Sequence, residues 1–343
     1  MTTKSISAET LFAQMDKFSQ AKEPFLFAID YEMQEAYFIP NPIEQEEIRF
    51  CIHGKGNATN EKNPDKAYTF KAFPECYEQY LKRFEVIHKA EIDGNSFLAN
   101  LTIATPIHCS LQLNEIYDYA KAPYKLHIPN RLVCYSPEAF VHITQDGKIS
   151  SYPMKGTIDA TIPNAAKILQ NDYKEKSEHY TIVDLIRNDL SKVSKHVRVD
   201  RFGYLDKIIT TDSQILQMSS EISGQLSTED MNRLGNVISQ LLPAGSISGA
   251  PKEATCHAIR EAEQRERGFY SGVFGYYDGK TLDSAVMIRY IEQVDQTMDE
   301  EEASSQSSEQ TPMFRFHSGG GITIHSKPED EYNEVLQKVY LPF

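Results

Sequence analysis

Short runs rich in β-branched and aromatic residues recur from residue 96 to the end of the chain, and they constrain the fold more than any other feature. The runs between residues 96 and 154 are closely spaced, and the last one turns at Asp146-Gly147, a dipeptide that favours tight hairpins. Further runs occur at 204–209, 220–226, 269–279, 284–294 and 313–324. Closely spaced short strands with turn signals predict antiparallel sheet.

Helical spacing of apolar residues separates these runs. Amphipathic helices are predicted at 8–20, 76–90, 178–193, 229–242 and 252–263, with strands at 24–39 and loops at 57–66 and 243–252. The helix at 178–193 has an unusually polar outer face. The whole pattern predicts an α+β protein.

Charge and cysteine content exclude several classes of protein. The 35 basic and 49 acidic residues give a net charge of −14, which argues against general binding to nucleic acid or anionic membranes. The first 23 residues lack a signal-peptide pattern and no apolar stretch is long enough for a membrane span, so a cytoplasmic location is expected. The five cysteines show no CxxC spacing and are expected to be reduced. Residues 293–312 contain six acids and no Lys or Arg, which predicts a flexible acidic loop.

Standard nucleotide, zinc-protease and serine-hydrolase motifs are absent from the sequence. Four polar segments remain as candidate sites. The first combines Glu138 with Lys155, where the chain is expected to leave a strand through Gly156. A lysine in an apolar or cationic setting becomes a neutral nucleophile, and a buried Glu stays protonated as an acid. An ordinary Lys-Glu ion pair at a hairpin edge is the alternative.

The second segment is a set of carboxylates. Glu178 is predicted at a helix start, and Glu331 and Glu334 lie three residues apart on one face of a helix that begins near Pro328. Together they could form a cage for Mg²⁺, which prefers oxygen ligands. A solvated face with a Glu334–Lys338 pair explains the same residues without a metal.

The third and fourth segments carry glycines next to cationic side chains. The loop 243–252 ends in Lys252, and its backbone amides with this cation could hold a carboxylate or phosphate. The glycines of 319–321 follow a strand, with Arg289 and Tyr270 earlier in the chain. Glycines let a ligand approach the main chain, and Arg binds carboxylates in bidentate fashion. For the loop 243–252, the alternative is a tight connection without a ligand. For the glycines 319–321, the alternative is a close contact between strands.

The order of seven motifs is far more specific than any one of them. The succession SPE, PMKGT, EHYTIVDLIRNDL, PAGSISGAPK, RGFYSGVFGYYDG, AVMIRY and SGGGITIHSKPEDEYNEV closely resembles the chorismate-utilising enzymes. The resemblance covers residues 76–343, the expected catalytic region. It implies two facing antiparallel β-sheets with outer helices, as in anthranilate synthase component I. Residues 1–75 are then expected to form a shortened N-terminal α/β subregion packed on this core.

Residue differences within that family favour one reaction. Lys155 is the third residue of the PxxGT motif, where the resemblance implies Lys in aminodeoxychorismate synthases and usually Ala in anthranilate, isochorismate and salicylate synthases. Leu98 aligns with the Lys base of isochorismate and salicylate synthases, so those reactions are disfavoured. Gln217 stands where the family often has His, and Ala244 replaces a loop glycine. Without an LLES-type signature, feedback inhibition by tryptophan is not expected.

The resemblance also implies roles for the candidate residues. Lys155 adds to C2 of chorismate while Glu138 protonates the leaving C4 hydroxyl, and ammonia then attacks C4. Mg²⁺ is held by Glu178, Glu331 and Glu334. The residues expected to bind the substrate are Gly156, Thr157, Lys252, Tyr270, Arg289, Gly319, Gly320 and Gly321.

Missing motifs point to separate partner proteins. The sequence has no Gly-x-Cys-x-Gly elbow of a glutamine amidotransferase and no recognisable lyase segment. A separate amidotransferase subunit is therefore expected to supply ammonia, and a separate lyase to make 4-aminobenzoate for folate synthesis. Anthranilate synthase component I and a catalytically silent chorismate-binding subunit are the alternatives.

Overall fold

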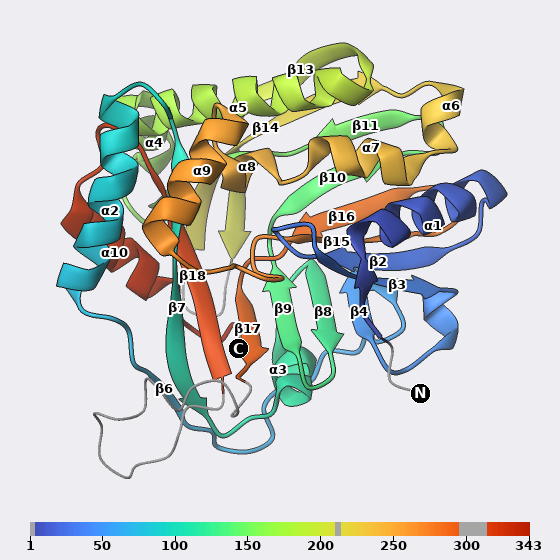
Figure 1. Cartoon of the computed structure of the whole chain (residues 1–343). Coiled ribbons are helices and arrows are strands. Elements are labelled where there is room, and N and C mark those ends of the chain that lie inside the picture. The colour runs from blue at the N-terminus through green and yellow to red at the C-terminus, as the bar shows by residue number, and fades with distance from the viewer. Residues whose placement is uncertain (1–3, 210–213, 295–313) are drawn as a thin grey trace.

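The computed structural model describes residues 4–209, 214–294 and 314–343 of the chain. Two antiparallel sheets form the centre of the protein, with helices on their outer faces (Figure 1). The prediction of an α+β fold with two antiparallel sheets is confirmed. The predicted acidic loop at 293–312 lies, from residue 295 onward, outside the described residues.

The first sheet has ten strands, drawn from the beginning, middle and end of the chain. Its strands in spatial order are β1 (Ile6–Ser7), β3 (Glu35–Pro40), β2 (Phe25–Ile29), β15 (Val273–Tyr277), β16 (Leu282–Val286), β10 (Ala139–Ile143), β11 (Lys148–Ser151), β14 (Gln214–Gln225) and β12 (Met154–Asp159), and β13 (Lys195–Ile209) also pairs with β14. The strand β12 that carries Lys155 is therefore at one edge of the path.

The second sheet has eight strands, and β18 lies near its middle. Its spatial order is β5 (Lys55–Gly56), β4 (Arg49–Ile52), β8 (Tyr124–Ile128), β9 (Leu132–Ser136), β17 (Tyr290–Gln293), β18 (Phe314–Ile322), β7 (Ala99–Cys109) and β6 (Phe70–Ala72). Strands from residues 1–75 belong to both sheets. The division of the chain at residue 75 stays a prediction.

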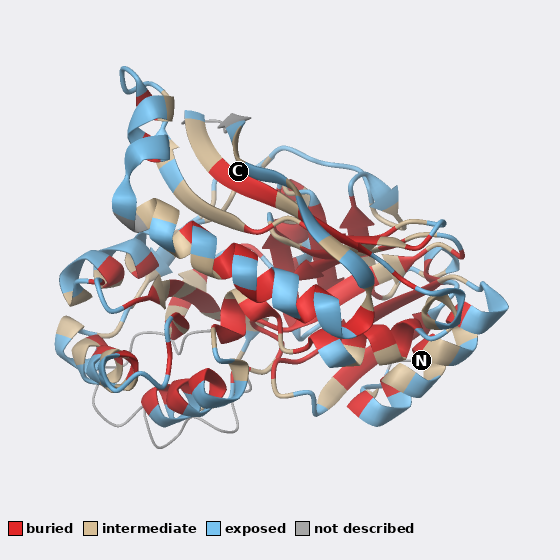
Figure 2. Cartoon of the chain, turned by 90° about the horizontal axis from the view of Figure 1, so that it is seen from above, coloured by how far each residue is buried: buried red, intermediate tan, exposed pale blue. Residues whose placement is uncertain are grey.

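Helices cover the outer faces of the two sheets. They are α1 (Ala8–Ala21), α2 (Tyr77–Ile92), α3 (Leu113–Tyr119), α4 (Ala165–Asn171), α5 (Tyr173–Val193), α6 (Thr228–Met231), α7 (Leu234–Leu241), α8 (Gly245–Ser248), α9 (Lys252–Glu263) and α10 (Pro328–Gln337), with a 3₁₀ turn at Pro42–Glu44. Each longer helix buries one stripe of residues and exposes its opposite face (Figure 2). No described helix combines the length and the apolar character that crossing a membrane requires.

Apolar side chains of both sheets pack together between them. Leu26 and Phe274 of the first sheet share one buried cluster with Leu126 and Tyr290 of the second. A second cluster joins the first sheet to α1, α5 and α7, and a third joins β7 and β18 to α2, α9 and α10. Burial of this apolar surface fixes the sheets relative to each other, so residues on β12 and β18 are held in place by the core.

Three helix predictions needed correction. Helix α5 begins at Tyr173, because Asp172 caps it by accepting a hydrogen bond from the Glu175 amide. Glu178 therefore lies inside a helix and not at its start. The helix predicted at 229–242 is two helices, α6 and α7, and the loop predicted at 243–252 contains the short helix α8.

The start of α7 depends on a contact from the other end of the sequence. The Leu234 amide donates to Ser19 Oγ of α1 at 3.3 Å, and the Asn236 amide donates to Asp16 Oδ1 of α1 at 3.0 Å. These side chains satisfy amides that have no partner within the helix. A helix start capped from α1 leaves no signal in the sequence around residue 234.

Candidate active site

Lys155 is the second residue of β12, near the start of the strand and not at its exit as predicted. The pairing of β12 with β14 shifts register between Met154 and Thr157, and Gly156 has a φ of 85°. Such a bulge redirects a side chain from the regular alternation of a strand. The Lys155 amine lies 3.5 Å from Glu178 Oε2 of α5, and its side chain is 24% exposed. It is therefore held between β12 and α5 and does not extend into bulk solvent.

The backbone of β18 lies close to the same amine. A Cβ atom built on Gly321 would lie 2.6 Å from Lys155 Nζ and 3.3 Å from Leu98 Cδ1. The edge strand of the first sheet thus meets a central strand of the second sheet at Lys155. Only a residue without a side chain leaves the amine in this position.

Alanine at position 321 is expected to displace the Lys155 amine while the protein stays folded. The atom that the new methyl group meets is the flexible end of Lys155, so the fold can adapt. We expect at least a tenfold loss of turnover, on the order of the effect of a small misplacement of a reacting group. Ser318→Ala is the control in the same strand, because Ser318 is buried in β18 and its hydroxyl has no hydrogen-bond partner among the described residues. Equal activity of the two variants would contradict the prediction.

Gly319 and Lys338 form the next part of the site. A Cβ on Gly319 would lie 2.9 Å from the Leu101 carbonyl of β7, so close strand packing already requires glycine there. The Gly319 carbonyl accepts a hydrogen bond from Lys338 Nζ at 2.8 Å, and Lys338 also pairs with Glu334 at 2.7 Å. Burial lowers the pKa of Lys338, and the charges of Lys155 and Arg289 act in the same direction.

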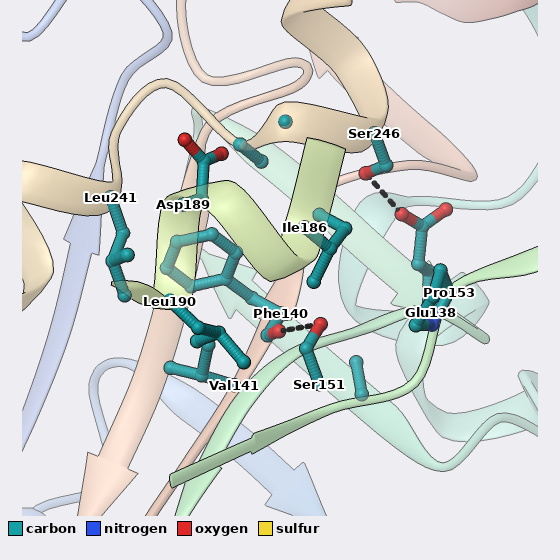
Figure 3. Close-up of a pocket in the computed structure, with 13 residues that line it drawn as sticks. Glu138, Phe140, Val141, Ser151, Pro153, Ile186, Asp189, Leu190, Leu241 and Ser246 are labelled. Carbon is teal, nitrogen blue, oxygen red and sulfur yellow. Dashed lines mark hydrogen bonds between the residues drawn. The ribbon is translucent and has the colours of Figure 1, made fainter. Parts of the chain in front are cut away.

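Glu138 lies directly before β10, next to a pocket formed with α5 and the α7–α8 connection (Figure 3). Burial raises the pKa of the Glu138 carboxyl. The Ser246 hydroxyl donates to Glu138 Oε1 at 2.5 Å and opposes this shift, as do the more distant positive charges of Lys155, Lys338 and Arg289. The net direction favours the protonated acid, the form that can donate a proton.

Glu138 and Lys155 flank one hairpin, as considered from the sequence, because Glu138 directly precedes β10 and β12 follows the antiparallel partner β11. Strands β11 and β12 both pair with β14, and the pair Met154–Ser219 continues the register of β11. The ion-pair partner of Lys155 is Glu178, so the alternative of a Lys-Glu pair with Glu138 is not found. The charge of Lys155 nevertheless reaches the Glu138 carboxyl. The structure thus brings the two groups into one site from separate strands.

The other predicted binding residues divide into two groups. Arg289 lies at the site, since its charge acts on Glu138 and Lys338. Tyr270 is buried nearby, with its pKa raised to about 12 by burial. Lys252 has a different partner: its amine lies 2.9 Å from Asp189 Oδ2 and donates to the Leu241 carbonyl at 2.9 Å.

Gly156 and Thr157 follow Lys155 in β12. A Cβ on Gly156 would point toward Glu175 and Leu169 of the helices α5 and α4, and Thr157 is an exposed residue of the edge strand. Direct contact of Lys252, Gly156 and Thr157 with substrate stays a prediction.

Comparison with known proteins agrees with the motifs. Residues 8–342 match the family described as chorismate binding enzyme. The chain belongs to the chorismate binding enzyme family. It is 46% identical to an uncharacterized PabA-like protein of Haemophilus influenzae, over 96% of this chain and 95% of that protein.

Relatives of this chorismate binding enzyme include two different synthases. It is 30% identical to an anthranilate synthase component 1 of Haloarcula marismortui, over 90% of this chain and 60% of that protein. It is 29% identical to the aminodeoxychorismate synthase component 1 of Bacillus subtilis, over 82% of this chain and 58% of that protein. Among solved structures, a putative 2,3-dihydroxybenzoate-specific isochorismate synthase of Bacillus anthracis has the same fold, with a TM-score of 0.69 and 19% identity over 98% of this chain and 89% of that one.

Enzymes of this family commonly use Mg²⁺, and the carboxylates suit that ion in their chemistry. Glu331 Oε2 and Glu334 Oε1 lie 3.6 and 4.0 Å from a Cβ built on Gly320, and Glu178 lies beside Lys155. Mg²⁺ binds through one or two carboxylates and retains water. Within the described part of the chain, no three His, Cys, Asp or Glu side chains are already grouped as a metal site. Two of the carboxylates form ion pairs instead, Glu178 with Lys155 and Glu334 with Lys338.

Sequence reasoning missed three residues of this site. Lys338 was considered only as the partner of Glu334 on a solvated helix face, and Ser246 was treated as part of a loop. Glu91 was not considered at all. Burial raises its pKa to about 8, and the negative charges of Glu178 and Glu331 contribute. The available signal for Glu91 was its position one residue past the helix predicted at 76–90, at helical spacing from Phe84 and Ile87.

Proposed function

We propose that this family member is an aminodeoxychorismate synthase component I, which converts chorismate and ammonia to 4-amino-4-deoxychorismate. The observation that carries the proposal is the Lys155 amine, held by β12 between Glu178 and the glycine backbone of β18. A lysine in this place offers a nucleophile, and the half-buried Glu138 offers a proton. The ring of chorismate would lie between them.

The first step uses both groups. The neutral Lys155 amine forms a bond to C2, the ring double bond shifts, and the C4–O bond breaks as Glu138 gives its proton to the hydroxyl, which leaves as water. The adduct is then a secondary ammonium and Glu138 a carboxylate. Because the Lys155 amine lies 3.5 Å from Glu178 Oε2, it must leave this carboxylate before it attacks C2.

The second step restores the enzyme. Ammonia forms a bond to C4, the double bond shifts back, and Lys155 leaves as a neutral amine. The new C4 ammonium returns one proton to Glu138, so chorismate and ammonia give the amino product and water with no other reagent. Two displacements by good nucleophiles replace one difficult substitution.

Positive groups around the site would hold the two carboxylates of chorismate. Arg289, Tyr270 and the amides of Gly319–Gly321 would bind them, and Lys252 would join once released from Asp189. Mg²⁺ held by Glu178 and Glu334, with Glu331 near, would supply charge neutralisation of the ring carboxylate. We further propose that a separate glutamine amidotransferase subunit supplies the ammonia and that a separate lyase uses the product for 4-aminobenzoate and folate synthesis.

Product identification tests this function directly. The chain is incubated with chorismate, Mg²⁺ and ammonium chloride at mildly alkaline pH, and the products are identified by mass spectrometry. The proposal expects an amino-cyclohexadiene that retains the enolpyruvyl group. Anthranilate with pyruvate would instead establish the anthranilate synthase reaction, and glutamine-dependent activity of the chain alone would refute a separate amidotransferase.

Ser246 is expected to lower the pKa of the general acid Glu138. Its hydroxyl stabilises the ionised form of Glu138 and so lowers the pKa of that carboxyl. In Ser246→Ala the pKa of Glu138 rises, and the alkaline limb of the kcat/KM profile moves to higher pH. Ser239→Ala is a matched control, because that hydroxyl donates to the Asn236 carbonyl within α7. An alkaline limb that stays in place in Ser246→Ala would show that Glu138 is not the titrating acid.

A further inference from the structure

Glu91 lies in an unexpected position on α2. The buried residues of this helix are Tyr80, Phe84, Ile87 and Glu91, whose spacing of four, three and four residues defines a single stripe. The first three are apolar and pack in the cluster with β7, β18 and α9. Glu91 extends the stripe by one turn and is only 5% exposed. A carboxylate thus occupies a place where packing alone would favour an apolar side chain.

Neither oxygen of the Glu91 carboxyl has a hydrogen-bond partner among residues 4–209, 214–294 and 314–343. An unsatisfied buried polar group costs about 1–3 kcal/mol, and more when it is charged. Other acids of the same helix, such as Glu78 and Glu85, lie on its exposed face, where water solvates them. Glu91 therefore needs a partner that the described side chains do not supply.

The charged groups around Glu91 are those of the candidate metal site. Glu178 of α5 and Glu331 of α10 are the charges that act on its carboxyl. The nearby ammonium groups are already engaged, since Lys155 pairs with Glu178 and Lys338 with Glu334. Three helices thus direct carboxylates to one region, and a divalent cation is the group that would compensate them together.

We propose that Glu91 is a fourth carboxylate of the divalent-cation site and binds the ion together with Glu178, Glu331 and Glu334. The ion is a hard divalent cation such as Mg²⁺ or Mn²⁺, which prefers oxygen ligands. The inference rests on the metal site of the proposed function. It does not depend on which product the enzyme makes.

Manganese binding to the metal-free full-length chain tests this assignment without chorismate. Free Mn²⁺ is counted by electron paramagnetic resonance during titration of the wild type, Glu91→Gln and the control Glu85→Gln. Glu85→Gln removes the same charge from the exposed face of α2 and is expected to bind like the wild type. Glu91→Gln is expected to bind Mn²⁺ about 10–100-fold more weakly, the usual effect of removing a group that supports a metal site.

Thermal unfolding separates a metal role from a structural one. Without metal, Glu91→Leu is expected to melt at a higher temperature than the wild type, because it replaces a buried carboxyl that has no partner with an apolar side chain. With saturating Mn²⁺ the wild type gains stability by mass action, and Glu91→Gln and Glu91→Leu both gain less. Glu91→Leu continues the apolar stripe and serves as the second variant if Glu91→Gln does not fold.

Three outcomes would overturn the assignment. They are unchanged Mn²⁺ affinity in the Glu91 variants, a lower melting temperature of Glu91→Leu without metal, and no Mn²⁺ binding by the wild type. The last would also remove the metal from the proposed function. Failure of the amination itself is a separate result, because it is read from the product with chorismate and ammonium chloride.

Discussion

Turnover of chorismate with ammonia falls by at least about 10³-fold in Lys155→Ala, as expected when a covalent nucleophile is removed. The amine is fixed between Glu178 and the Gly321 backbone, and no other amine takes its place when it is lost. The Lys338 amine is close enough for the Lys155 charge to act on it, but it is bound to the Gly319 carbonyl and to Glu334. Any remaining amination is therefore slow, direct attack by ammonia.

Intact-protein mass spectrometry provides a second readout for Lys155. Wild-type enzyme mixed with chorismate in the absence of ammonia should gain the mass of chorismate less water, and Lys155→Ala should not. Lys148→Ala is the matched control: this lysine of β11 also pairs with carboxylates, Asp200 and Glu221, on the same sheet. Unchanged turnover of Lys155→Ala in the system reconstituted with its partner proteins would favour the alternative of a catalytically silent chorismate-binding subunit.

Strand and helix content could be predicted from local pattern, whereas the pairing of distant segments could not. The runs at 24–39 and 269–279 were each predicted as strands, and β2 does pair with β15. Nothing in either run specifies that partner, because both are simply apolar. The facing arrangement of the sheets came from the family resemblance, in which the order of motifs carries information that periodicity lacks.

Site residues were predictable where a residue type is unusual for its place. Lys155 and the glycines 319–321 were identified because lysine before glycine and three successive glycines are rare in strands, and the structure brings them together. Lys252 was chosen because it ends a Gly/Pro loop at a helix start, yet Asp189 of α5 pairs with it. The sequence of a loop does not reveal an acid on another helix.

The missed residues look ordinary in the sequence. Lys338 follows Glu334 at a spacing typical of exposed helix pairs, and only tertiary packing buries it against the Gly319 carbonyl. Ser246 is one of two serines in a loop rich in Gly and Pro, and its role depends on the hydrogen bond that it donates to Glu138. The roles of these residues depend on contacts between distant elements, which cannot be recognised from the local pattern of a single sequence.

Glu138→Gln is expected to lower turnover by about 10²–10⁴-fold, the usual contribution of a general acid. Glutamine keeps the size of the side chain and still accepts the Ser246 hydrogen bond, so the fold and pocket should be retained. What it lacks is the proton that the leaving hydroxyl needs. The loss should therefore appear in kcat more than in binding of chorismate.

The pH dependence distinguishes this role from a structural one. Because burial raises the pKa of Glu138, the acid form persists to higher pH than for an exposed Glu, and wild-type kcat/KM falls as pH rises through that pKa. At a fixed concentration of unprotonated ammonia, this fall should be absent in Glu138→Gln. Glu32→Gln is the control, since Glu32 also has a raised pKa from burial but accepts hydrogen bonds from the Arg267 and Gly268 amides outside the site. If Glu138→Gln kept the alkaline fall, or lost less than about tenfold in rate, the proton would have to come from another group.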